Sequence, residues 1–210
     1  MVQWPLPVST DIVRSLSSEE ETGMESKRLW TVALVTALVS ALNSSTMPAQ
    51  AKDKYTVKVP GGLAFSEFRG YESWQLISLS QSGDIVAAIL GNPMMIQAYE
   101  KGIPANGKTV PDGAKMAKVH WTAKKSEKAP SPTTVAGALH DVDFMAKDSK
   151  RFADSGGWGY GAFKYDAASA SFTPATTADA PPQANDAKCG FGCHTIVKSR
   201  DYVFTEYGSR

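Results

Sequence analysis

Residues 188–198 (KCGFGCHTIVK) hold both cysteines of the 210-residue chain and one of its three histidines. Three residues separate Cys189 from Cys193, and His194 follows at once. Two thiols this close together can hold a covalent haem, close a local disulfide or bind a metal ion. The rest of the domain must therefore be built around whichever of these the segment forms.

A covalent haem anchor normally reads Cys-x-x-Cys-His, with the histidine as iron ligand. Here Cys193 and His194 keep their adjacency, whereas Cys189 lies one residue farther away. In a helix, one extra residue rotates a side chain by about 100° around the axis. Gly190 and Gly192 give the backbone the freedom to absorb this change. The spacing is unusual for a haem anchor but compatible with one.

Two alternatives remain open from this segment alone. Residues four apart on a helical turn lie about 6 Å apart, within the range of a disulfide, and an exported protein meets oxidising conditions. A zinc site is less favoured, because only His120 and His140 remain as histidine partners and the chain has no second cysteine pair.

The N-terminal part has the layout of a secretory signal peptide. After Met24 come Lys27 and Arg28, an apolar run over residues 29–42 and the small-x-small site Ala-Gln-Ala at 49–51. The run is shorter than the ~20 residues that span a bilayer. We expect residues 24–51 to be a signal peptide and 1–23, which are acidic, to be an untranslated or disordered leader. The mature protein is then expected in the periplasm.

Residues 52–210 remain after such cleavage and suffice for a single domain with its own core. The whole chain has 22 basic and 21 acidic residues. Residues 1–51 hold three basic and five acidic ones, so residues 52–210 keep 19 and 16, a net charge of +3. So mild a charge argues against nucleic acid as a partner.

Short alternating segments dominate the domain. Asn92 and Pro93 predict the start of a helix that continues over 94–101 and stops at Gly102. No regular strand–helix rhythm appears, so the pattern predicts an α+β domain, mainly an antiparallel sheet with a few helices. Residues 173–188 form a low-complexity connector to the cysteine segment. Strands are predicted over residues 55–59, 73–80, 84–90, 114–121, 141–145 and 158–165.

The segment 114–121 (AKMAKVHW) has two clearly different faces. Ala117, Val119 and Trp121 alternate onto one side, and Met116, Lys118 and His120 onto the other. By itself Lys118 is an ordinary lysine on the polar face of a strand, because lysine is usually exposed.

Four stretches together resemble the cytochrome P-460 family of exported c-type haem proteins, which also includes cytochrome c′-beta. They are the turn at 111–113 (PDG) followed by Lys118, residues 147–153 (KDSKRFA), the aromatic strand over 157–163, and residues 189–204 with their DYVF ending. The likeness extends from about Phe65 to Gly208.

The resemblance implies a mainly β homodimer with one haem c, joined covalently to Cys189 and Cys193. It also implies that His194 is the proximal iron ligand and that Lys118 occupies the position of a lysine cross-linked to the haem. The expected function is oxidation of hydroxylamine or nitric oxide, with a soluble cytochrome as electron acceptor. His120 and His140 are candidates for a proton relay, although a structural role is the ordinary one for a histidine.

Two departures from the family pattern favour another function. Family members that oxidise hydroxylamine carry a distal arginine and an acidic residue just after the haem histidine. The corresponding stretches here, 85–88 (IVAA) and 195–197 (TIV), contain neither. An apolar pocket favours binding of neutral diatomic gases over their activation. A gas-binding or electron-transfer protein like cytochrome c′-beta is therefore one alternative, and a haem-free domain with a Cys189–Cys193 disulfide is another.

Overall fold

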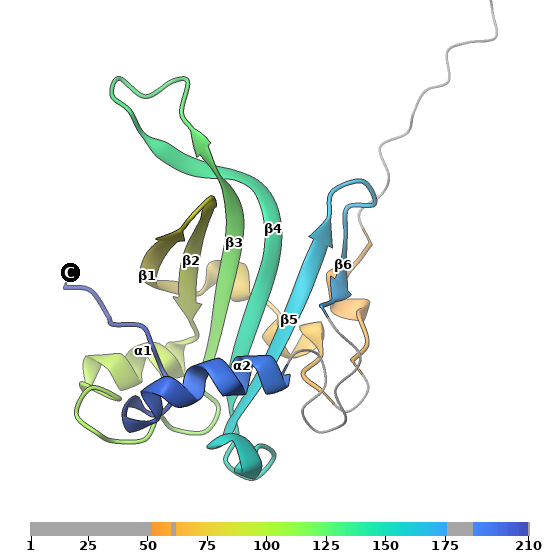
Figure 1. The fold of residues 1–210 in the computed structure, drawn as a ribbon. Coiled ribbons are helices and arrows are strands. Elements are labelled where there is room, and N and C mark those ends of the chain that lie inside the picture. The colour runs from red at the N-terminus through yellow and green to blue at the C-terminus, as the bar shows by residue number, and fades with distance from the viewer. Residues whose placement is uncertain (1–51, 60–61, 176–186, 210) are drawn as a thin grey trace, which may run out of the picture. The chain divides into compact units, whose positions relative to one another are not determined.

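The computed structural model describes residues 52–59, 62–175 and 187–209, all of which belong to one compact unit. Alternating sequence segments pair there into an antiparallel sheet whose strands follow one another in chain order (Figure 1). The strands are β1 (Gln75–Ser82), β2 (Ile85–Gly91), β3 (Lys115–Lys125), β4 (Thr134–Lys147), β5 (Trp158–Asp166) and β6 (Ser171–Pro174). The predicted α+β class is confirmed.

Side-chain alternation along the strands gives the sheet two different faces. On β3, Ala117 and Val119 pack in one hydrophobic core, together with aromatic residues that precede β1 in the chain. Met116, two residues before Lys118, enters a second core on the opposite face. The faces predicted for 114–121 are thus confirmed for these residues.

The first core is closed by short 3₁₀ helices at Phe65–Phe68 and Tyr71–Ser73. Phe65 and Phe68 are fully buried there, and the Phe68 ring stacks on Phe144 of β4 with centroids 4.0 Å apart. Aromatic pairs of this kind contribute beyond the area they bury.

The second core is covered by α1 (Pro93–Glu100) and by the C-terminal segment. The Asn92 side chain caps α1 by accepting a hydrogen bond from the Met95 N–H (3.0 Å), and Lys101 ends it. This is the helix predicted from Asn92 and Pro93. The second helix, α2 (Ala187–His194), contacts β5 and lies across the sheet in Figure 1. A 3₁₀ helix follows at Thr195–Arg200.

Three local predictions need correction. The expected strand over 55–59 is a 3₁₀ helix (Lys54–Thr56) followed by coil, because Asp53 accepts the Tyr55 N–H and starts a turn. The strand expected over 141–145 is the end of the longer β4, and β6 occupies the start of the expected connector. The proposed leader and signal peptide lie outside the described residues. Within the ranges that the structure describes, no helix has the length and apolar character needed to cross a membrane.

Candidate functional site

A cavity of about 510 Å³ opens on the second face of the sheet, bounded by α2 and the segment after it. All four predicted site residues (Lys118, Cys189, Cys193 and His194) line this one cavity, although about 70 positions separate the lysine from the cysteines. The remaining wall is mostly apolar and comes from all strands but β6, from α2 and from 203–205. It includes Ser78, Ser80, Ile89, Met116, Asp143, Phe144, Met145, Tyr160, Gly161, Ala162, Gly190, Val203, Phe204 and Thr205.

The two cysteines lie one helical turn apart on α2. Side chains at positions i and i+4 share one helix face, so the spacing brings both thiols to the same cavity. Both are exposed and neither is in a disulfide.

His194 is the last residue of α2, and one of its two ring nitrogens has a hydrogen-bond partner. Its Nδ1 lies 2.6 Å from the Tyr202 carbonyl oxygen, which can only accept, so Nδ1 carries a proton and donates it. Nε2 then keeps the lone pair, as in histidines that bind metals. Burial lowers the pKa of His194; the Tyr202 carbonyl opposes this, and the nearby charge of Lys118 lowers it further. The neutral, metal-binding form is thereby favoured.

The carbonyl that orients His194 is itself held by a buried network. Asp201 and Tyr202 both have positive φ (48° and 64°), a backbone shape that needs support from its surroundings. The indole N–H of Trp158 donates to the Asp201 carbonyl oxygen (2.8 Å). This contact joins the β5 strand to the turn that follows α2 and the 3₁₀ helix.

Lys147, at the end of β4, is the centre of that network. Its buried Nζ donates to both carboxylate oxygens of Asp201 (2.9 and 3.0 Å) and to the Gly156 carbonyl oxygen (2.9 Å). The Val110 N–H also donates to Asp201 Oδ2 (2.8 Å). A buried ion pair whose hydrogen-bonding groups are satisfied fixes geometry, and removing one partner is costly.

Gly156 shows how tightly this region is packed. Its φ is +69°, and an added Cβ would lie 2.1 Å from Cε2 of the Tyr202 ring. A side chain at this position would displace Tyr202, whose carbonyl oxygen orients His194. The glycine before β5 therefore leaves room for Tyr202, and so helps to keep the carbonyl oxygen that orients His194 in place.

Lys118 projects from the middle of β3 and pairs in register with Ile89 of β2 and Asp143 of β4. Sequence reasoning missed Asp143, which places a carboxylate in the cavity wall. Ile196, where an acid was expected from the family pattern, is 80% exposed and is not among the lining residues. The alternation of β4 around the buried Val142 and Phe144 is the signal that could have indicated Asp143.

A family model described as Cytochrome P460 matches residues 68–205 of this chain. The chain belongs to the cytochrome P460 family. The comparison with curated proteins found no match. Membership in the cytochrome P460 family implies a haem cytochrome, with haem and its iron as cofactor. The matched range contains the cavity, α2 and the network that orients His194.

The residues of the cavity fit the haem that the cytochrome P460 family implies. Two thiols on one helix face, a neutral histidine with Nε2 unprotonated, and an apolar wall are the donor set and surroundings that a haem requires. Gly190 of α2 packs so closely that an added Cβ would lie 2.9 Å from the Tyr160 side chain. This close approach sets α2 directly on the sheet beside the cavity.

Proposed function

We propose that the protein is an exported mono-haem c-type cytochrome that oxidises hydroxylamine or nitric oxide. The observation that carries the proposal is that Lys118, Cys189, Cys193 and His194 line one apolar cavity. The haem, when bound, would supply the redox chemistry.

The residues of the chain would divide the work as follows. Cys189 and Cys193 would hold the haem by thioethers, and His194 Nε2 would ligate iron while the Tyr202 carbonyl keeps the ring oriented. Lys118 would bond to the porphyrin edge. Asp143, beside Lys118 in the register, supplies the carboxylate that can accept a proton from hydroxylamine. Electrons would pass to a soluble cytochrome.

The apolar wall gives a specific reason to keep a second function in view. Ile89, Met116 and Met145 line the cavity, and the stretch 85–88 brings no arginine to it. Such surroundings suit the binding of nitric oxide without turnover, as in a cytochrome c′-beta-like protein. The two functions differ in whether Lys118 is bonded to the haem.

The cell compartment and assembly follow from the same proposal. We place residues 52–210 in the periplasm as one haem domain, after removal of 24–51 as a signal peptide, and expect a homodimer. N-terminal sequencing of periplasmic material should begin near Lys52. A start well before that residue contradicts the export proposal.

Intact mass and the visible spectrum test the haem assignment. The denatured protein should exceed the mass of its chain by one haem, and the reduced protein should absorb to the red of an ordinary c-type haem. His194→Ala should change the iron spectrum while the thioethers still form. A chain lacking two hydrogens and any haem would instead show the disulfide form.

Lys118→Leu separates the enzyme from the gas binder. The variant should regain an ordinary c-type spectrum and lose hydroxylamine turnover while it still binds nitric oxide. Lys124→Leu is the matched control, because Lys124 lies on the same strand with its side chain 61% exposed. If the parent already has an ordinary spectrum that Lys118→Leu leaves unchanged, the protein is a gas binder.

A further inference from the structure

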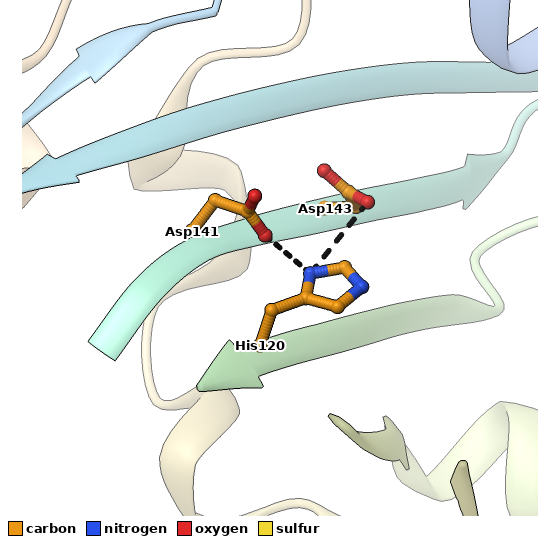
Figure 2. Close-up of side chains that lie close together, drawn as sticks. All are labelled: His120, Asp141 and Asp143. Atoms are coloured by element: carbon orange, nitrogen blue, oxygen red, sulfur yellow. Dashed lines mark ion pairs between the residues drawn. The ribbon is translucent and has the colours of Figure 1, made fainter. Parts of the chain in front are cut away.

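Three metal-binding side chains meet on the sheet beside the haem cavity. Figure 2 shows His120 of β3 with its ring nitrogen directed at Asp141 and Asp143 of β4. His120 Nδ1 contacts Asp141 Oδ1 and lies 3.8 Å from Asp143 Oδ2. The three donor atoms all lie within 4.8 Å of one another. One imidazole nitrogen and two carboxylate oxygens thus converge on one point.

Regular antiparallel pairing places the carboxylates there, because His120 pairs with Asp141 and Lys118 pairs with Asp143. The register breaks just beyond this point, where the residue after His120 in β3 pairs with Leu139, so His140 is an extra residue in β4. Such bulges re-aim side chains and are frequent next to active sites. His140 Nδ1 lies 2.6 Å from the other carboxylate oxygen of Asp141, Oδ2. A hydrogen bond to a carboxylate's second oxygen is the usual outer support of a metal ligand.

Two of the converging atoms have only each other as partners. His120 Nδ1 and Asp141 Oδ1 are buried and in close contact, and neither makes a further hydrogen bond. A cation held by both would give each of these buried polar atoms a full partner.

We propose that His120, Asp141 and Asp143 form a binding site for one divalent transition-metal ion, such as Zn²⁺, beside the haem cavity. With His120 neutral, the two carboxylates bring a charge of −2, which the cation neutralises. Three protein ligands with one nitrogen leave a position for water or substrate, as in catalytic zinc sites. Mg²⁺ and Ca²⁺ prefer oxygen-only sites and should bind far more weakly.

The site goes beyond the proposed function but touches it through Asp143. That carboxylate also lines the cavity and is the register partner of Lys118. A bound cation would draw the Asp143 carboxylate away from proton transfer in the cavity. Zinc should therefore lower any hydroxylamine turnover without displacing the haem.

Calorimetric titration with Zn²⁺ tests the site without relying on haem. The full exported chain is used with Cys189→Ser and Cys193→Ser, so that zinc cannot bind the two thiols, and the haem-loaded parent is titrated beside it. Both should bind one Zn²⁺ per chain, and Mg²⁺ should not compete. His120→Ala and Asp143→Asn should each weaken binding about 100-fold or more, and His140→Ala, which removes only the outer support, about 10-fold.

Asp84→Asn, which removes an exposed carboxylate outside the cluster, is the matched control and should bind like its parent. The Asp143 side chain is about half exposed, so Asp143→Asn should not unfold the chain. Weaker zinc binding by this variant would therefore reflect the lost ligand and not misfolding. Zinc should also raise the melting temperature of the parent, but not that of His120→Ala or Asp143→Asn. The proposal fails if the cysteine-free chain shows no saturable binding, or if His120→Ala and Asp143→Asn bind zinc as tightly as Asp84→Asn. A failed haem assignment would leave the titration of the cysteine-free chain unaffected.

Discussion

The two faces of the sheet are filled in opposite ways, although the same strands supply both. One face packs aromatic rings against one another, with Phe65 at centroid distances of 5.2 Å from Phe144 and 4.8 Å from Phe163. The other face keeps a cavity whose wall includes the charged side chains of Lys118 and Asp143. A two-residue alternation therefore separates stability from chemistry along each strand.

This difference means that neighbouring residues should respond differently to substitution. A residue on the aromatic face has no solvent or cavity to relax into, so its removal leaves a void. A residue on the cavity face already borders open space, so its removal changes binding more than folding. The comparison is wrong if shortening a side chain lowers the free energy of unfolding equally on both faces.

The largest loss should follow from emptying the aromatic face. Phe65 is 0% exposed and has five aromatic neighbours, so Phe65→Ala should lower the free energy of unfolding by about 4 kcal/mol. Urea denaturation measures it. Leu79→Ala, at a side chain on β1 that is 70% exposed, should change it by less than about 0.5 kcal/mol. Similar losses in the two variants would contradict a closed aromatic core.

Breaking the ion pair that supports the cavity face should come next. Asp201→Asn leaves the Lys147 charge buried without a negative partner, which should cost about 3 kcal/mol. Unlike Phe65→Ala, it should also loosen the Tyr202 carbonyl and so disturb His194. The measurement is urea denaturation together with the His194 imidazole resonances by NMR. Arg200→Ala, one residue earlier at a partly exposed pair, is the control and should leave those resonances in place.

How far the sequence predicted these features depends on the range of the interactions. The faces of β3 and the start of α1 follow from local alternation and capping, and both were predictable. That Lys118 lies in the same cavity as the cysteines was expected only from the family resemblance. Local sequence could not predict it, because strand order and register decide which residues line the cavity. The Lys147–Asp201 pair could not be predicted, since 54 residues separate its partners. The His140 bulge leaves no local sequence signal either, because it depends on pairing with β3.

Adjacent residues of β3 give the sharpest test of the two faces. Val119 is 6% exposed in the aromatic core, so Val119→Ala should cost about 2 kcal/mol from lost burial and the resulting void. Lys118→Leu should change stability by less than about 0.5 kcal/mol, because Lys118 borders the cavity. Chemical denaturation of the two variants measures the difference, in the haem-free Cys189→Ser, Cys193→Ser chain, where Lys118 has no porphyrin to bond to. Equal losses would mean that Lys118 supports the fold and not the cavity alone.

The smallest expected effect lies where α1 holds the rim of the cavity. Tyr99 packs its ring on Tyr207 and shares a hydrogen bond with Thr205 Oγ1 (2.8 Å), a residue of the cavity wall. Burial raises the pKa of Tyr99 to about 12, although the Thr205 hydrogen bond and the Arg200 charge oppose it.

Because that pKa is raised in the folded state, the folded protein holds the Tyr99 proton more tightly than the unfolded chain does. The contribution to stability is therefore fully present below about pH 10, the ordinary tyrosine value, and is lost as pH rises through about 12. Near neutral pH, Tyr99→Phe should lower the free energy of unfolding by about 1 kcal/mol through the lost hydrogen bond. Denaturation of both proteins across this range should show the gap closing, because phenylalanine has no proton to lose. A gap that stays constant through about pH 12 would mean that Tyr99 ionises without cost and that this edge of the cavity is open to water.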